Sequence, residues 1–216
     1  MAILHRADLR PTKLELLGGW LPAQSWYVGD EHSQLVAVGA YRFDDPLGEV
    51  GIETHLIRAE GGPILQVPLT YRGVPLPGGE RFLIGTTQHS VLGRRWVYDA
   101  CADPVYASVL TDVVLGYATQ AEEYVEGDGR RDRRTPTVFV TGTGTGPTDR
   151  GAPAVRQRED VDCSSDGNRT VITSRTHELT LLRVVDPAAR TTHEHALHGT
   201  WSGLEQPVPL ATARGL

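Results

Sequence analysis

Alternation of apolar and polar residues predicts several strands in the first half of the chain. The segment from Val50 to Leu56 alternates with a period of two, which is the pattern of a half-buried strand. Residues 65–71 alternate in the same way, and residues 35–43 and 82–87 read as further strands. Because the turns between these strands are short, we expect an antiparallel meander. Pro68 predicts an edge or a bulge in its strand, because proline cannot donate to a ladder.

Two segments carry helix signals. Residues 11–21 begin with Pro11, which suits the first helical position, and their leucines recur on one face. The stronger helix starts at Asp103, because Asp serves as the N-cap and Pro104 fits the first helical position. Gly116 is a plausible stop for this helix.

The second half of the chain has weaker patterns. The charged run over residues 127–136 predicts a solvated loop that joins two subdomains. Residues 137–141 read as a strand, residues 142–153 as a flexible loop and residues 169–185 as a hairpin. The tail after Pro187 has little periodicity, and we expect it to be irregular.

These elements predict an α+β protein with two parts. Residues 1–126 form an antiparallel sheet with helices, and residues 135–216 form a smaller β-rich subdomain with an irregular C-terminal tail.

The composition limits the classes of function. A net charge of −6 disfavours nucleic-acid binding, which needs a basic face. The N-terminus lacks the apolar core of a signal peptide, and no apolar run approaches the roughly 18 residues of a membrane span. Cys101 and Cys163 are too few for a disulfide framework and fit free thiols in a reducing compartment. We therefore expect a cytoplasmic protein that binds neither nucleic acid nor membrane.

Lys13 is the only lysine in the chain, which nearly excludes reactions that depend on a lysine. The segment from Thr141 to Gly146 follows a strand, as a phosphate-binding loop would. It is followed by Pro147 and a polar loop instead of a helix, so we interpret it as a flexible loop.

Three stretches resemble the N-terminal cap domain of maltokinases, enzymes that phosphorylate maltose. They are Lys13 to Tyr27, with its Trp20-Leu-Pro; Leu65 to Arg72, a strand with a proline; and Trp96 to Tyr106, the most specific of the three. Together they span about residues 10–125. The resemblance implies a curled antiparallel sheet with flanking helices, and a link to maltose, trehalose, glycogen or other α-glucan metabolism.

Residues 166–172 and 178–187 resemble, more weakly, the first hairpin of a kinase N-lobe. The hairpin of a kinase leads to the lysine that pairs with ATP. The comparable position here is near Leu182 or Arg183, and arginine does not replace lysine cleanly. His198-Gly-Thr200 has a threonine where a catalytic loop would need an aspartate. We therefore expect a pseudoenzyme-like chain with no kinase activity, no catalytic residues and no cofactor.

A sugar or sugar-phosphate site on the concave face of the curled sheet is a second hypothesis. Such sites combine aromatic rings with a few polar neighbours. The candidate residues are Trp26, Tyr27, Tyr71, Arg72, Arg94, Arg95, Trp96 and Tyr98. The alternative is that the rings fill the core and the arginines are solvated.

A metal-dependent hydrolase is a third hypothesis, based on His193, His195 and His198. On a strand the first two would share a face, and His198 would need a turn to join them. Three such ligands and a water form many catalytic zinc sites. The alternative is an exposed, histidine-rich tail.

Other titratable groups fit structural roles. The carboxylates of Asp44, Asp45, Glu49 and Glu53 fit a solvated turn and sheet face, and Cys101 fits a buried or half-buried structural thiol.

The leading hypothesis is a non-catalytic, cap-like accessory or interaction module. Its partner would be an enzyme of maltose, trehalose or α-glucan metabolism, or a second copy of the chain.

Overall fold

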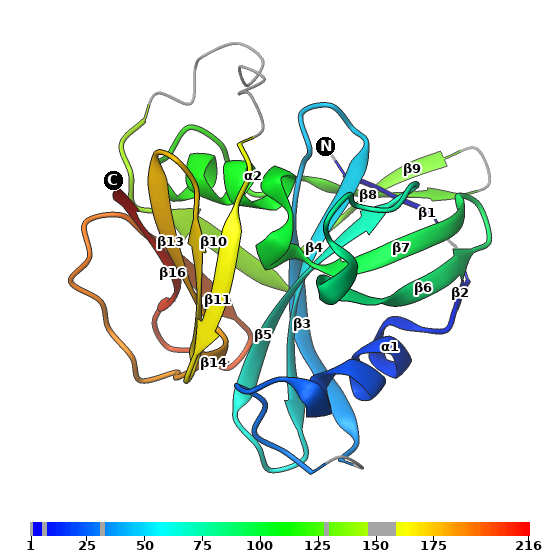
Figure 1. The fold of residues 1–216 in the computed structure, drawn as a ribbon, viewed down its shortest axis with the longest axis horizontal. Helices are drawn as coiled ribbons and strands as arrows, with labels where there is room; N and C mark the ends of the chain where they lie inside the picture. Colours follow the sequence, from blue (N-terminus) through cyan, green and yellow to red (C-terminus); the bar gives the residue numbers. More distant parts are fainter. Residues whose placement is uncertain (1, 6–7, 31–32, 128–129, 147–158) are drawn as a thin grey trace.

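The protein is mostly β, with two short α-helices, α1 (Lys13–Trp20) and α2 (Pro104–Val114) (Figure 1). The computed structural model describes residues 2–5, 8–30, 33–127, 130–146 and 159–216. The predicted antiparallel sheet and flanking helices are confirmed, but the helical share is smaller than an α+β class implies. Neither helix in the described part of the chain has the length and apolar character needed to cross a membrane.

The first sheet is curled and antiparallel, with the strand order β2-β6-β7-β5-β4-β3 and with β14 paired to β5. The strands are β2 (Leu9–Arg10), β3 (Leu35–Phe43), β4 (Val50–Ala59), β5 (Ile64–Arg72), β6 (Leu83–His89), β7 (Gly93–Asp99) and β14 (Val184–Val185). We refer to it as the cap sheet. The strands predicted around residues 35–43, 50–56, 65–71 and 82–87 are all present in it.

Pro68 lies in β5, a central strand of the cap sheet, so the predicted bulge is wrong, but one side of the strand is a local edge at this residue. Pro68 faces Thr54 in an unbroken β4–β5 ladder. On its other side, β5 pairs with β14 only up to Leu65 and with β7 only from Leu69. On that side the Gln66 N–H donates to the Arg183 carbonyl. Pro68 is two residues further along the strand, so its backbone nitrogen faces the same side. The missing N–H of Pro68 therefore falls in a gap of the sheet.

A second antiparallel sheet has the order β10-β15-β16-β13-β12-β11. Its strands are β10 (Val138–Gly142), β11 (Asp162–Asp166), β12 (Arg169–Thr173), β13 (His177–Leu182), β15 (Ala196–Trp201) and β16 (Val208–Gly215). The predicted strand at residues 137–141 and the predicted hairpin are confirmed.

The prediction of an irregular C-terminal tail is wrong, because β15 and β16 are central strands of the second sheet. Four successive residues of β16, Val208 to Ala211, are all buried. A strand that is buried on both faces shows no alternation, which is why periodicity did not reveal it.

The main hydrophobic core lies between the two sheets, with α2 packed into it (Figure 1). Tyr41 and Leu56 from the cap sheet, Tyr106 from α2, and Leu181 and Leu210 from the second sheet belong to one buried cluster. The regions predicted as 1–126 and 135–216 thus share a core, and their division into two domains stays a prediction. A smaller cluster lies under α1, on the other face of the cap sheet.

Both helices begin at residues that satisfy their free N–H groups. Asp103 is the N-cap of α2 and accepts from the Val105 N–H, as predicted. Helix α1 begins two residues later than Pro11, with Thr12 and Glu15 forming a capping box.

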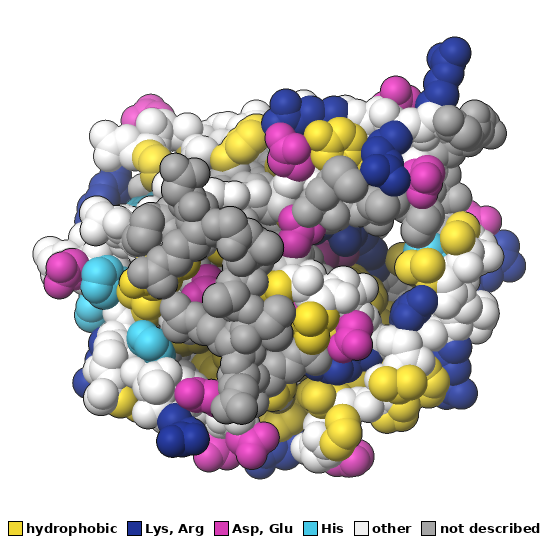
Figure 2. Space-filling view, turned by 90° about the horizontal axis from the view of Figure 1, so that it is seen from above, with side chains coloured by type: hydrophobic (Ala, Val, Ile, Leu, Met, Phe, Trp, Pro, Cys, Tyr) yellow, Lys and Arg dark blue, Asp and Glu magenta, His cyan; other side chains and the backbone are white. Residues whose placement is uncertain are grey.

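The described part of the charged run over residues 127–136 is largely exposed, as predicted, but it contains a strand instead of a loop. Strand β9 (Arg130–Arg134) pairs with β8 (Glu123–Gly127), which pairs with β1 (Ala2–His5). Opposite charges face each other across this hairpin, as in Arg131 and Glu126 at 3.7 Å. Acidic and basic side chains also lie intermingled on the face shown in Figure 2.

The glycine-rich segment after β10 packs against the C-terminus of α2. The N–H groups of Gly144 and Gly146 donate to the Val114 and Leu115 carbonyls, at 3.0 Å each. A Cβ on Gly144 would lie 2.2 Å from backbone atoms of Leu115, so a glycine is required there. These glycines therefore cap a helix end instead of forming a flexible loop, and residues 147–153 of the predicted loop lie outside the described residues.

Candidate functional site

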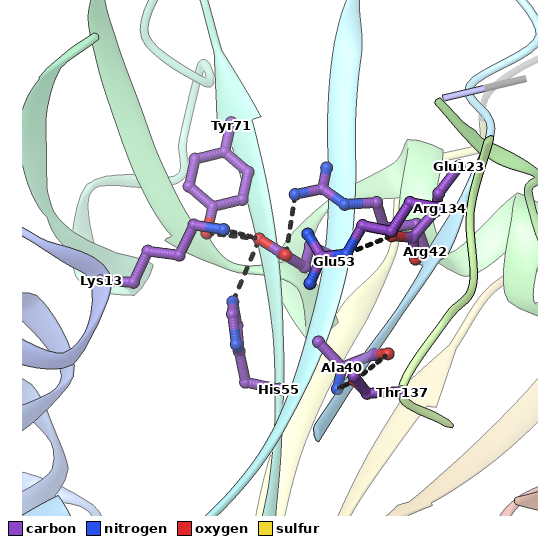
Figure 3. A network of polar contacts seen from close by, with 9 residues as sticks. All are labelled: Lys13, Ala40, Arg42, Glu53, His55, Tyr71, Glu123, Arg134 and Thr137. Atoms are coloured by element: carbon purple, nitrogen blue, oxygen red, sulfur yellow. Dashed lines mark hydrogen bonds and ion pairs between the residues drawn. The ribbon is translucent and has the colours of Figure 1, made fainter. Parts of the chain in front are cut away.

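Glu53 lies at the centre of a polar cluster beneath α1 (Figure 3). Its carboxylate lies 2.5 Å from Lys13 Nζ and 2.7 Å from Arg42 Nη2. His55 Nε2 lies 3.1 Å from the same carboxylate, and the Tyr71 hydroxyl donates to it at 3.2 Å. We call these five residues the Glu53 cluster.

Strand register brings the cluster together. Arg42 faces Glu53 across the β3–β4 ladder, and opposite residues share a face of a sheet. His55 follows Glu53 by two residues on β4 and therefore points to the same face. Helix α1 covers this face and supplies Lys13, so a polar strand position becomes buried: Glu53 is only 5% exposed.

The surrounding basic groups keep Glu53 ionised. Burial alone would raise its pKa, but Arg42, His55 and Lys13 outweigh burial and hold the pKa well below its usual value of 4.5. Burial and the neighbouring Glu53 carboxylate raise the pKa of the Tyr71 hydroxyl well above 10.0, so Tyr71 stays protonated and donates.

A second carboxylate extends the cluster toward the β8–β9 hairpin (Figure 3). Glu123 is buried and lies 3.8 Å from Arg134. Burial raises the pKa of Glu123, although Arg42 and Arg134 oppose the shift. Lys13, Arg42 and Arg134 carry the positive charges and Glu53 and Glu123 the negative ones, so the charges nearly cancel. This arrangement links α1 to the cap sheet through the Lys13 ion pair, and it links the hairpin through the attraction between Arg42 and Glu123.

Arg183 forms a second buried charge site, between the two sheets. It is 0% exposed, and its guanidinium donates to Asp99 at 2.5 Å and to Thr170 at 2.7 Å. The ring of Trp26 lies 4.6 Å from Arg183 Cζ. Asp99 ends β7 of the cap sheet and Thr170 lies in β12, so the guanidinium links the cap sheet to the second sheet.

The residues predicted for a sugar site are divided between the two faces of the cap sheet. Tyr71 faces Val97 across the β5–β7 ladder, whereas Arg72 faces Trp96. Successive residues alternate between faces, so Tyr71 and Arg95 lie on the α1 side, together with Trp26 in the cluster under α1. Arg72, Arg94, Trp96 and Tyr98 lie on the other side.

Several of the residues predicted for the sugar site are buried or already make contacts within the fold. Trp26 and Tyr98 are each 2% exposed. Arg72 makes two hydrogen bonds of 2.7 Å to Asp103, the N-cap of α2. Arg94 lies over the ring of Trp96 at 4.9 Å.

The remaining two candidates bond to backbone carbonyls close to them in sequence. Tyr27 donates to the Asp30 carbonyl at 3.2 Å, and Arg95 donates to the Leu92 carbonyl at 2.8 Å. The structure thus does not assemble the eight residues into one platform.

The three predicted metal ligands lie along the approach to β15. His193 is exposed in the preceding loop, His195 is half-buried and His198 lies in the strand itself. Over the described ranges, which include all three, no group of three or more His, Cys, Asp or Glu side chains is placed to hold a metal ion. The geometry therefore adds no support to the hydrolase hypothesis.

Two of the carboxylates expected on a solvated surface are buried. Asp45 is 9% exposed and accepts from the N–H groups of Leu47, Glu49 and Val50, so it organises the β3–β4 turn. Composition marks Lys13 as the single lysine, but no sequence signal pairs it with Glu53. Periodicity shows the strand but not the helix that covers it.

Comparison with known protein families gives one match that agrees with this geometry. Residues 20–103 match the maltokinase N-terminal cap domain, so the chain contains this domain. The matched segment runs from the end of α1 to Asp103 and holds β3 to β7, including Arg42, Glu53 and Asp99. No curated protein matches the chain.

Proposed function

We propose that the chain acts as a non-catalytic interaction module in maltose and α-glucan metabolism. The cap domain over residues 20–103 supports the metabolic link. The Glu53 cluster supports a structural role for the polar residues of that domain, because its charges pair with one another inside the fold.

The observation that carries this proposal is the burial of Arg183. The resemblance to a kinase N-lobe puts the ATP-pairing cation near this position. Here the side chain is fully buried and paired with Asp99. A guanidinium held in this way stabilises the junction of the two sheets and is not presented to a nucleotide phosphate.

The partner in this proposal is an enzyme of maltose, trehalose or α-glucan metabolism, or a second copy of the chain. A cytoplasmic setting is part of the proposal. Both Cys101 and Cys163 are free thiols, as is usual in a reducing compartment.

Co-purification of the full chain with purified candidate enzymes tests the proposal. A maltokinase, a trehalose synthase, a glucan branching enzyme and a maltosyltransferase form the panel. We expect one of them, or the chain itself, to form a complex of defined stoichiometry in size-exclusion chromatography with light scattering. A strictly monomeric chain that leaves all four enzymes unshifted contradicts the proposal, and so does ATP-dependent phosphorylation of maltose by the chain alone.

A further inference from the structure

A pocket of about 310 Å³ lies between α2 and the β12–β13 hairpin. Pro104, Ala107, Ser108 and Thr111 of α2 line it, and they recur at helical spacing on one side of the helix. This volume is at the lower end of the roughly 300–1,000 Å³ of typical small-molecule sites. The lining residues lie outside residues 20–103, so the pocket does not belong to the matched cap domain.

One part of the pocket is apolar. Ala107, Ile172 and Leu179 are each less than 5% exposed, and all belong to the main core. Because they are fixed by the core, they give the pocket a rigid wall that can contact the apolar face of a small ligand.

The rest of the pocket offers hydrogen-bonding groups. Within the described part of the chain, no group pairs with the Ser108 hydroxyl. Thr111 donates to the Ala107 carbonyl at 2.8 Å, which leaves its oxygen able to accept. Glu159 accepts from the Arg175 N–H at 3.1 Å through one carboxylate oxygen, which leaves the other available.

These groups select the charge and chemistry of a ligand. The described lining residues include the Glu159 carboxylate and the His177 imidazole but no lysine or arginine. A phosphate or another anion would therefore meet repulsion from Glu159, with no lysine or arginine among these described residues to offset it. A ligand with several hydroxyl groups can donate to Glu159 and Thr111, accept from Ser108 and place its apolar face on the wall.

We propose that this pocket binds a small, uncharged polyhydroxyl compound of sugar size. The choice of sugars derived from maltose and α-glucans rests on the proposed function, whereas the polyhydroxyl class rests on the pocket alone.

Calorimetric and NMR titration of the full chain tests this inference. The probes are glucose, maltose and trehalose, with glucose 1-phosphate and ethanolamine as charged probes. We expect saturable binding of at least one neutral sugar, with shifts of backbone amides in α2 and β12–β13. Binding of a charged probe in preference to all three sugars contradicts the proposal, as does the absence of saturable binding by any sugar at millimolar concentration.

Matched variants separate this pocket from other surfaces. Ser108→Val replaces the unpaired hydroxyl with an apolar side chain, and we expect it to weaken sugar binding about tenfold. Ala107→Leu fills the pocket and should abolish binding. Ser164→Val is the control, because Ser164 is exposed and faces Val171, which lies on the opposite sheet face from Ile172.

Urea unfolding of each variant shows whether it is folded before binding is compared. If Ala107→Leu unfolds the protein, the comparison of Ser108→Val with Ser164→Val decides the test. Equal sugar affinity in these two variants overturns the proposal. Loss of sugar binding without loss of the enzyme complex would leave the interaction module intact, so the two proposals can fail separately.

Discussion

Arg183 and Asp99 form a buried ion pair, 2.5 Å long, that joins the second sheet to the cap sheet. Asp99 is 5% exposed and Arg183 is 0% exposed, so neither charge can be solvated if the other is removed. The pair therefore fixes how the two sheets meet.

Removing either partner of this pair should strongly destabilise the protein. Arg183→Met leaves the Asp99 carboxylate buried without a partner, and Asp99→Asn leaves the guanidinium in the same situation. We expect each to lower the free energy of unfolding by about 3–5 kcal/mol, as for other broken buried pairs. Urea denaturation measures this change.

A double-mutant cycle gives the energy of the pair itself. We expect Arg183→Met combined with Asp99→Asn to cost less than the sum of the two single changes. Arg214→Met is the control, because it removes an exposed pair with Glu178 and should change stability little. Strict additivity, or single variants as stable as the control, would contradict the structural role of Arg183.

Glu53 should contribute to the loss of stability in acid. The fold holds its pKa well below 4.5, so its stabilisation is complete above that pH and is lost as the pH falls through the folded-state pKa. Glu53→Gln should therefore be less stable than the parent at neutral pH, and the two should converge in acid. Urea unfolding over a series of pH values measures the difference. A difference that is independent of pH would show that Glu53 is not an ionised partner in the fold.

Lys13 should anchor α1 to the cap sheet. Its side chain is 26% exposed, and its ammonium donates to Glu53. We expect Lys13→Met to cost about 1–2 kcal/mol and to speed hydrogen exchange in α1 more than in α2. Lys13→Arg keeps the charge and serves as the control. Unchanged exchange in α1 would mean that the apolar contacts of Leu17 and Leu21 suffice to hold the helix.

The glycines after β10 should be far less tolerant of substitution than the glycines of α1. Gly144→Ala puts a methyl group 2.2 Å from backbone atoms of Leu115, and we expect it to cost at least about 2 kcal/mol. Gly18→Ala is a matched comparison, because a Cβ there meets nothing within 4 Å and alanine favours a helix. We expect it to stabilise the protein by up to about 1 kcal/mol. Thermal unfolding compares the two, and a well-tolerated Gly144→Ala would contradict the close packing of this segment on α2.

Sequence patterns predicted the parts of the fold in which one face of a strand is polar. Residues 50–56 alternate visibly because the pattern of polar positions survives on β4, and the Asp103-Pro104 start of α2 depends only on local capping chemistry. β16 was missed because burial on both faces removes the alternation. The burial of β15 does alternate, but one of its buried positions is Gly199, so its apolar pattern is weak. Local sequence signals thus predicted many of the helices and strands. The predictions failed where contacts with distant parts of the chain determine burial.

The candidate site was harder to predict because it depends on distant contacts. Glu53 and Lys13 are separated by 40 residues, and Arg183 and Asp99 by 84. Composition singled out Lys13 but could not indicate its partner. The aromatic and arginine residues proposed for a sugar site were close in sequence, yet strand alternation sends them to opposite faces of the cap sheet.

Sedimentation velocity of the purified chain, alone and with each enzyme of the panel, tests the central claim most directly. The account predicts a new species of defined stoichiometry with one of these enzymes or with the chain itself, formed without ATP. A chain that sediments as a monomer in every mixture, and that transfers phosphate from ATP to maltose by itself, would contradict it.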